Sequence, residues 1–128
     1  SGGEAARLML ALRAALASAD GSPTLILDEV DAGLGGRAAQ AVAARLAALA
    51  RSHQIVCVTH LASVAAAADR HIRVGKRVDG GRTVVEARAL EGEERALEIA
   101  RMLSGTVSEP SLAHARALLE GAAGPDSG

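Results

Sequence analysis

Aromatic residues are absent: the 128 residues of the chain include no phenylalanine, tyrosine or tryptophan. Proteins that bind single-stranded nucleic acid commonly stack the bases on aromatic rings, and this chain has no such platform. It cannot stack an aromatic ring on the base of a nucleotide either. Any base that meets the chain must therefore be held by other groups.

The chain also has a single cysteine and a net charge close to zero. The single cysteine, Cys57, cannot form an internal disulfide and is typical of a reducing cytosol. Fourteen basic and 15 acidic residues nearly cancel, so net charge does not attract the chain to DNA. No apolar run reaches the roughly 18 residues of a membrane helix, and no signal peptide is visible. We expect a cytoplasmic protein without membrane association.

A phosphate-binding loop of the form G-x-x-x-x-G-K-[ST] is missing from the chain. The backbone amides of such a loop hold the phosphates of a nucleotide. Gly75-Lys76 is not one, because Arg77 follows the lysine and Arg70 stands at the earlier glycine position. The G-x-S-x-G pattern is missing too, which argues against a serine hydrolase.

The most informative stretch is Thr24–Asp31, where an apolar run ends on the adjacent carboxylates Asp28 and Glu29. The run Leu25–Leu27 is typical of a buried parallel strand, and open α/β sheets bind ligands at the carboxyl ends of their strands. One acid can hold Mg²⁺ through water while the other activates a water for attack on a phosphate. A cation also relieves the repulsion between the two carboxylates, which favours a site over two solvated acids.

A second apolar run, Ile55–Val58, ends close to His60. This strand should lie beside the first, so His60 would reach the same sheet edge as Asp28 and Glu29, where an imidazole can donate a hydrogen bond to a phosphate oxygen. A single histidine at a strand end is more often structural, but this position favours function. Cys57 and His60 are no metal-ligand pair, because a strand places them on opposite faces.

The first four residues, Ser1-Gly2-Gly3-Glu4, have the pattern of a helix start with serine at the N-cap and glutamate three residues later. The unpaired amides of a first helical turn, next to glycines, can also approach a phosphate closely. From these four residues alone, an ordinary capping box is the more common interpretation.

The remaining pattern predicts an α/β fold with a mostly parallel sheet flanked by helices, then a C-terminal β-hairpin and further helices. The first helix should carry an apolar stripe of Leu8, Leu12 and Leu16, widened by Ala5, Met9 and Ala19. We expect later helices at 37–51, 61–68, 92–103 and 111–120, and a hairpin of 71–76 with 83–89 around the turn 79–81. Residues 1–120 would form one lobe and 121–128 a flexible tail.

Basic residues gather around the predicted hairpin. The simpler interpretation is that their charge protects an exposed edge strand from pairing with other chains. A contact with the DNA backbone is the less favoured alternative. The residues are Arg70, Arg73, Lys76, Arg77 and Arg82.

Three of these segments, in this order, resemble motifs of the head of an ABC-type ATPase. Ser1–Glu4 resembles the signature motif, Thr24–Asp31 resembles the Walker B strand, and Val58–His60 resembles the switch-histidine loop. The resemblance covers nearly the whole chain. It implies a partial P-loop fold, the C-terminal lobe of such a head.

Within that class, residues 28–35 resemble the SMC group, in which this segment usually has the sequence D-E-V-D-A-A-L-D. Here Gly33 replaces the second alanine and Gly35 replaces the last aspartate, so Gly35 lacks the carboxylate with which that loop contacts a second head. This variant, together with Thr59–Leu61, Ala100–Gly105 and Ala113–Arg116, is similar to the RecN family of SMC-like recombinational repair ATPases.

The resemblance implies that two heads of a homodimer enclose two ATP molecules. Ser1, Gly2, Gly3 and Glu4 would then contact the nucleotide of the second head, and Asp31 would lie where the heads meet. On their own head, three further residues would carry out hydrolysis. Asp28 would orient Mg²⁺ through water, Glu29 would polarise the attacking water, and His60 would sense the γ-phosphate.

Because the Walker A lobe is not in this chain, we expect the chain alone to be inactive, with that N-terminal lobe as a partner. DNA would bind through the full-length protein, at the bacterial nucleoid. One alternative is a module that only completes the site of a partner, although Glu29 would then serve no purpose. Another is a different SMC or ABC ATPase, such as a transporter; transporters usually have proline and threonine after the glutamate, where Val30 and Asp31 stand here.

Overall fold

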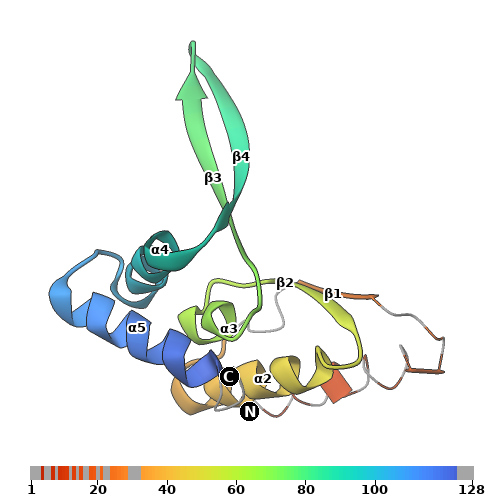
Figure 1. Cartoon of the computed structure of the whole chain (residues 1–128). Coiled ribbons are helices and arrows are strands. Elements are labelled where there is room, and N and C mark those ends of the chain that lie inside the picture. The colour runs from red at the N-terminus through yellow and green to blue at the C-terminus, as the bar shows by residue number, and fades with distance from the viewer. Residues whose placement is uncertain are drawn as a thin grey trace.

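The computed structural model describes residues 4, 7, 9–11, 13, 15, 18, 19, 21, 24–28 and 33–123. Helices and strands follow one another in the predicted order (Figure 1). The described positions between Glu4 and Ala19 are helical. The later elements are β1 Thr24–Asp28, α2 Gly36–Leu49, β2 Gln54–Val58, α3 Ala62–Ala66, β3 His71–Asp79, β4 Arg82–Leu90, α4 Gly92–Ser104 and α5 Glu109–Ala123.

β1 and β2 form a parallel pair in which Leu27 lies opposite Cys57 and Asp28 opposite Val58. Helix α2 packs against one face of this pair, as the crossover of a parallel pair requires. Leu27 is fully buried on that face, against residues of α2 such as Val42. This packing forms the first of two hydrophobic cores.

The other face of the pair is open. The side chains of Ile26, Val56 and Val58 are 69%, 48% and 58% exposed. The apolar runs predicted strands buried on both faces, and for these residues the prediction is wrong, because no described element covers them. The sequence of these strands is thus typical of strands buried on both faces, but in the structure only one face of the pair is packed.

The predicted apolar stripe of the first helix does not match the buried side chains among the described residues. Leu10, which the stripe omits, is buried in the first core, whereas Met9 is 48% exposed and Ala19 is exposed. The other members of the stripe, Ala5, Leu8, Leu12 and Leu16, lie outside the described residues.

Helix α3 belongs to both cores. Val64 packs in the first core, while Ala62, Ala65 and Ala66 pack in a second core with Ile99 of α4 and Ala115 of α5. The small alanine side chains allow helices to approach closely. In Figure 1, α3 lies between α2 and the pair formed by α4 and α5.

Arg95 of α4 fixes the end of α3. Its Nη2 atom donates hydrogen bonds to the carbonyl oxygens of Ala65 and Ala66, each at 3.2 Å, and to that of Ala68. The last carbonyls of a helix have no partner within the helix, so the guanidinium satisfies acceptors that would otherwise need water. A five-residue helix is thereby fastened to α4.

The hairpin β3–β4 forms a sheet of its own and projects from the body (Figure 1). Its turn residues Gly80 and Gly81 have φ of 55° and 78°, as a type I′ turn requires. The predicted mostly parallel sheet is thus correct only for β1 and β2. The described strands form two separate two-stranded sheets, one parallel and one antiparallel.

Helix α5 starts and ends differently from the prediction. It begins before Pro110, and Ser108 and Ser111 cap it reciprocally: each backbone N–H donates to the hydroxyl oxygen of the other residue, at 2.9 and 3.3 Å. It continues to Ala123, into the segment expected to be a tail after Glu120. Residues 124–128 lie outside the described residues.

We predict that Leu27→Ala lowers the free energy of unfolding of this chain by about 2–5 kcal/mol, because it leaves a cavity in the first core. Ile26→Ala on the same strand should cost about 1 kcal/mol or less, since that side chain is already exposed. Urea unfolding followed by circular dichroism measures both. Equal losses would contradict the one-sided packing of β1.

Candidate functional site

The carboxyl ends of β1 and β2 lie at one edge. Asp28, the last residue of β1, is opposite Val58, the last residue of β2, and Thr59 and His60 follow directly. The parallel register places Asp28 and the residues that follow Val58 at the same end of the strand pair. Both side chains are exposed, and Asp28 pairs with none of the described cations. Their chemical roles stay predictions.

The chain turns sharply after this edge. The backbone N–H of Leu61 donates a hydrogen bond to Oγ1 of Thr59 at 3.0 Å, a local bond that bends the chain into α3. Because α3 begins at Ala62, only Leu61 separates His60 from the helix that joins the two cores. The position of His60 is thus set by packing on both sides of it.

The loop before α2 is described from Gly33. Gly33 and Gly36 have φ of 74° and 53°, values that favour glycine, while Leu34 between them is buried in the first core. Leu34 therefore anchors the loop in which Gly35 replaces the aspartate of the SMC pattern. Gly35 itself forms the N-cap of α2 with extended backbone and no side-chain cap.

Apart from Asp28 and His60, the structure describes one of the predicted site residues. Glu4 is helical and exposed. The others lie outside the described residues: Ser1, Gly2, Gly3, Glu29 and Asp31.

Within the described part of the chain, no three His, Cys, Asp or Glu side chains gather as metal ligands would. Asp28 is an exposed carboxylate at a strand end, which suits a Mg²⁺ ion held through water and bound mainly by nucleotide phosphates. Among the same residues, no helix is long and apolar enough to cross a membrane.

In a comparison with protein families, residues 1–83 match the RecF/RecN/SMC N terminal domain. This chain belongs to the RecF/RecN/SMC family. The matched residues include the candidate edge with Asp28, Glu29 and His60.

Individual relatives of this RecF/RecN/SMC member are DNA repair proteins named RecN. The chain is 55% identical to RecN of Deinococcus radiodurans over 121 residues, 94% of this chain and 21% of that protein. It is 52% identical to RecN of Treponema pallidum and 54% identical to RecN of Streptomyces coelicolor, with similar coverage. The chain spans about a fifth of the length of these relatives. The resemblance to RecN is confirmed.

A solved structure from work on ATP-driven dimerization and DNA-stimulated activation of SMC ATPases has the same fold. The TM-score is 0.63 at 25% identity, and the match covers 84% of this chain and 64% of the other. This RecF/RecN/SMC member therefore corresponds to part of the head region of an SMC-type ATPase.

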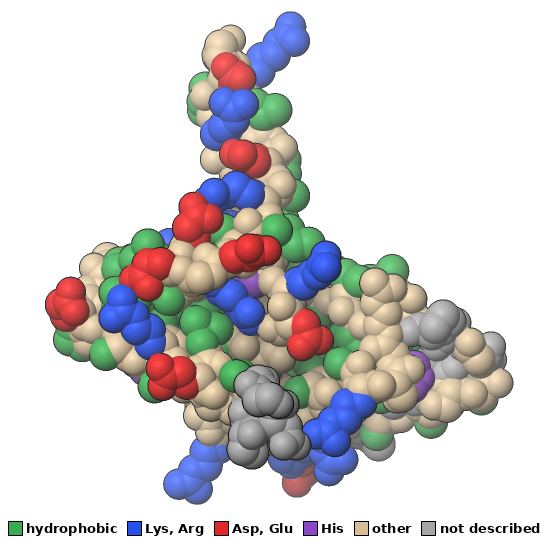
Figure 2. Space-filling view, in the orientation of Figure 1, with side chains coloured by type: hydrophobic (Ala, Val, Ile, Leu, Met, Phe, Trp, Pro, Cys, Tyr) green, Lys and Arg blue, Asp and Glu red, His purple; other side chains and the backbone are tan. Residues whose placement is uncertain are grey.

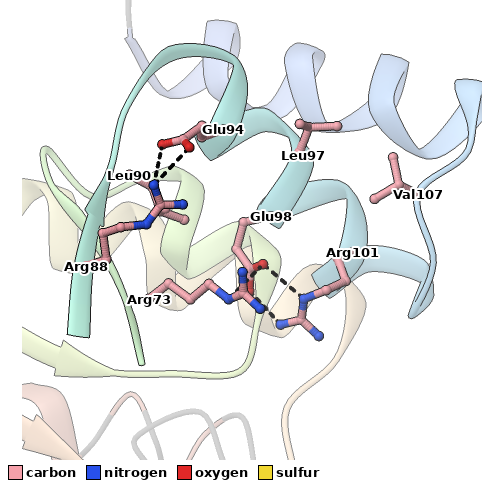
Figure 3. Close-up of a pocket in the computed structure, with 8 residues that line it drawn as sticks. All are labelled: Arg73, Arg88, Leu90, Glu94, Leu97, Glu98, Arg101 and Val107. Carbon is pink, nitrogen blue, oxygen red and sulfur yellow. Dashed lines mark hydrogen bonds and ion pairs between the residues drawn. The ribbon is translucent and has the colours of Figure 1, made fainter. Parts of the chain in front are cut away.

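A second cluster of charged residues in this family member lies at the base of the hairpin (Figure 3). Glu98 of α4 is only 8% exposed, and its carboxylate accepts hydrogen bonds from Nε and Nη2 of Arg101 at 2.9 and 2.5 Å. Nε of Arg73, on β3, lies 3.5 Å from the same carboxylate. The cluster borders an open hollow of about 250 Å³ and ties the hairpin to α4.

Glu98 was not predicted from the sequence. Its signal was weak: Glu98 and Arg101 have the i,i+3 spacing of a helical ion pair, and apolar Leu97, Ile99 and Ala100 surround Glu98 in sequence. Arg101 and Arg73 both pair with this carboxylate, so the charge of Glu98 is balanced within the cluster.

Burial and neighbouring charges shift the pKa values of Glu98 and of the nearby His71. The pKa of His71 is lowered by burial and by the neighbouring Arg95, although Glu98 opposes this. The pKa of Glu98 is lowered, chiefly because Arg101 donates hydrogen bonds to its carboxylate; burial opposes the shift, and the charges of Arg101 and Arg73 add to it. Nδ1 of His71 is buried without a hydrogen-bond partner in the described residues.

We predict that acid destabilises this chain in two stages. Since His71 binds a proton more weakly in the folded chain, stability falls as pH drops below the unfolded value of about 6.5. Glu98 stabilises the fold above its unfolded value of about 4.3, and this contribution is lost as pH falls through its lower folded pKa. Urea midpoints measured across pH should show both stages.

His71→Gln should remove the first stage and keep the second. The exposed His114 provides the matched control, because His114→Gln should leave both stages in place. A first stage of equal size in the His71→Gln variant would contradict this assignment.

Proposed function

We propose that this chain is the C-terminal lobe of an ATP-hydrolysing head of a RecN-type protein that acts in recombinational repair of DNA double-strand breaks. The observation that carries the proposal is the common edge of β1 and β2, where Asp28 and His60 leave neighbouring strands. Relatives named as DNA repair proteins match 94% or more of the chain. The SMC-type fold supports the same function.

The proposed chemistry assigns one role to each residue at the edge. Asp28 orients Mg²⁺ through water, Glu29 polarises the attacking water, and His60 donates a hydrogen bond to the γ-phosphate. When bound, Mg²⁺ would neutralise charge on the phosphate oxygens. The adjacency of Glu29 to Asp28 in sequence places it at this edge in the proposal.

The other half of each site comes from elsewhere. No phosphate-binding loop is present in this sequence, so an N-terminal Walker A lobe would hold the α- and β-phosphates. Ser1, Gly2, Gly3 and Glu4 would contact the nucleotide on a second head, with Asp31 where the heads meet. ATP would then join two heads of a homodimer, and hydrolysis would release them. DNA would bind through the full-length protein.

We predict that Glu29→Gln in a complete head keeps nucleotide affinity and lowers turnover by a factor of roughly 10²–10⁴, the usual contribution of a positioned general base. Steady-state hydrolysis and equilibrium binding of ATP separate the two effects. Glu120→Gln, which alters an exposed glutamate on α5, is the matched control and should change neither. Parallel loss of affinity and turnover in Glu29→Gln would contradict a role in catalysis.

A further inference from the structure

The open hollow beside the Glu98 cluster, which we name the hairpin-base hollow, has an apolar side. It consists of Leu90, which is buried, and of Leu97 and Val107, which are 39% and 50% exposed. Single exposed apolar residues are ordinary on a protein surface, but here two of them line one concave surface (Figure 3). The hollow therefore offers apolar area that an occupant would cover.

The loop that carries Val107 is fixed on both sides of this residue. The carbonyl oxygen of Thr106 accepts a hydrogen bond from Oγ of Ser104 at 2.6 Å. The backbone N–H of Ser108 donates to Oγ of Ser111 at 2.9 Å. Because the backbone is already ordered, the exposed Val107 side chain loses little conformational freedom when a partner covers it. Val107 is thus preorganised for a contact outside the chain.

Three guanidinium groups surround the apolar side. Arg73 and Arg101 share the carboxylate of Glu98. Arg88 pairs with Glu94, so the hollow has one more positive than negative charge. A guanidinium has five N–H donors, and within the described part of the chain Arg101 uses only Nε and Nη2 and Arg88 only Nη1 in hydrogen bonds. Donors therefore remain for an incoming carboxylate.

We propose that the hairpin-base hollow binds a short acidic and apolar segment of a partner protein. An apolar side chain of that segment would cover Leu97 and Val107, and an adjacent carboxylate would accept hydrogen bonds from Arg88 or Arg101. The volume of about 250 Å³ lies below the roughly 300–1,000 Å³ of small-molecule sites, so it suits one or two side chains and not a whole nucleotide. Arginine is also enriched among the residues that dominate protein–protein binding.

Nucleic acid suits this hollow less well. DNA binding depends on several cations that neutralise phosphates, whereas in Figure 2 acidic and basic side chains are interspersed over the hairpin and α4. Glu94 and Glu98 line the hollow and would repel phosphates placed there. A phosphate backbone would also leave Leu97 and Val107 uncovered. A peptide with one or two carboxylates beside an apolar group matches both the charge and the apolar side.

Selection from a library of random eight-residue peptides tests the proposal. Peptides that bind the full-length protein are retained, and those that also bind its Val107→Ser variant are discarded. The proposal expects the remaining peptides to carry Asp or Glu next to an apolar residue. The affinity of the most enriched peptide is then measured by fluorescence anisotropy.

Two further variants probe the two halves of the hollow separately. Leu97→Ser removes apolar area without altering the loop, and Arg88→Gln removes a guanidinium whose partner, Glu94, is exposed. Each should lower the affinity for the selected peptide by about tenfold or more. Val78→Ser and Arg82→Gln, near the hairpin turn and outside the hollow, are the matched controls and should change it less than about twofold.

Four outcomes decide the proposal, with circular dichroism confirming that each variant is folded. Retained peptides without a carboxylate, or with equal affinity for Leu97→Ser and the unaltered protein, would overturn it. Peptides that bind this chain but not the full-length protein would show that the hollow is covered there, which also overturns it. An absence of retained peptides would do the same, and weaker binding of a DNA duplex by Arg88→Gln would then assign the hollow to nucleic acid.

Discussion

The parallel pairing of β1 with β2 is the constraint on which the rest of the structure depends. It brings Asp28 opposite Val58, and so sets one edge at which a carboxylate and His60 leave the sheet together. It also buries Leu27 against α2 and leaves the side chain of the preceding residue, Ile26, exposed to solvent. A shift of one residue would exchange the two faces and remove both the core and the edge. The same strand register therefore determines both the candidate site at the sheet edge and the exposed apolar face of the strand pair.

Helix α3 carries this arrangement to the rest of the chain. It starts directly after the edge, contributes to both cores and ends on the guanidinium of Arg95. The same stretch of α4 holds Glu98, which binds Arg73 at the base of the hairpin. Helix α3 thus connects the segment that contains His60 to the strand pair and to α4, and α4 in turn holds the base of the hairpin.

Much of this was predictable from the sequence because the signals were local. Asp79-Gly-Gly81 predicted a tight hairpin turn, and apolar runs that end on polar residues predicted both parallel strands. Exposure was not predictable, since Ile26 and Val56 have the residue types of a buried strand and no described element packs on them. Glu98 was not predicted because its i,i+3 spacing to Arg101 is common on exposed helices, and its second partner, Arg73, lies 25 positions earlier in the sequence. The roles of Glu29 and Ser1–Glu4 came from family resemblance and not from geometry.

The central claim is that this chain contributes one half of a nucleotide site. The most direct measurement is ATP turnover by the chain alone, by the separately produced Walker A lobe, and by the two mixed. The account predicts no turnover above background for either part and hydrolysis only in the mixture. Turnover near about 1 per second by this chain alone, within the range of ordinary enzymes, would contradict it.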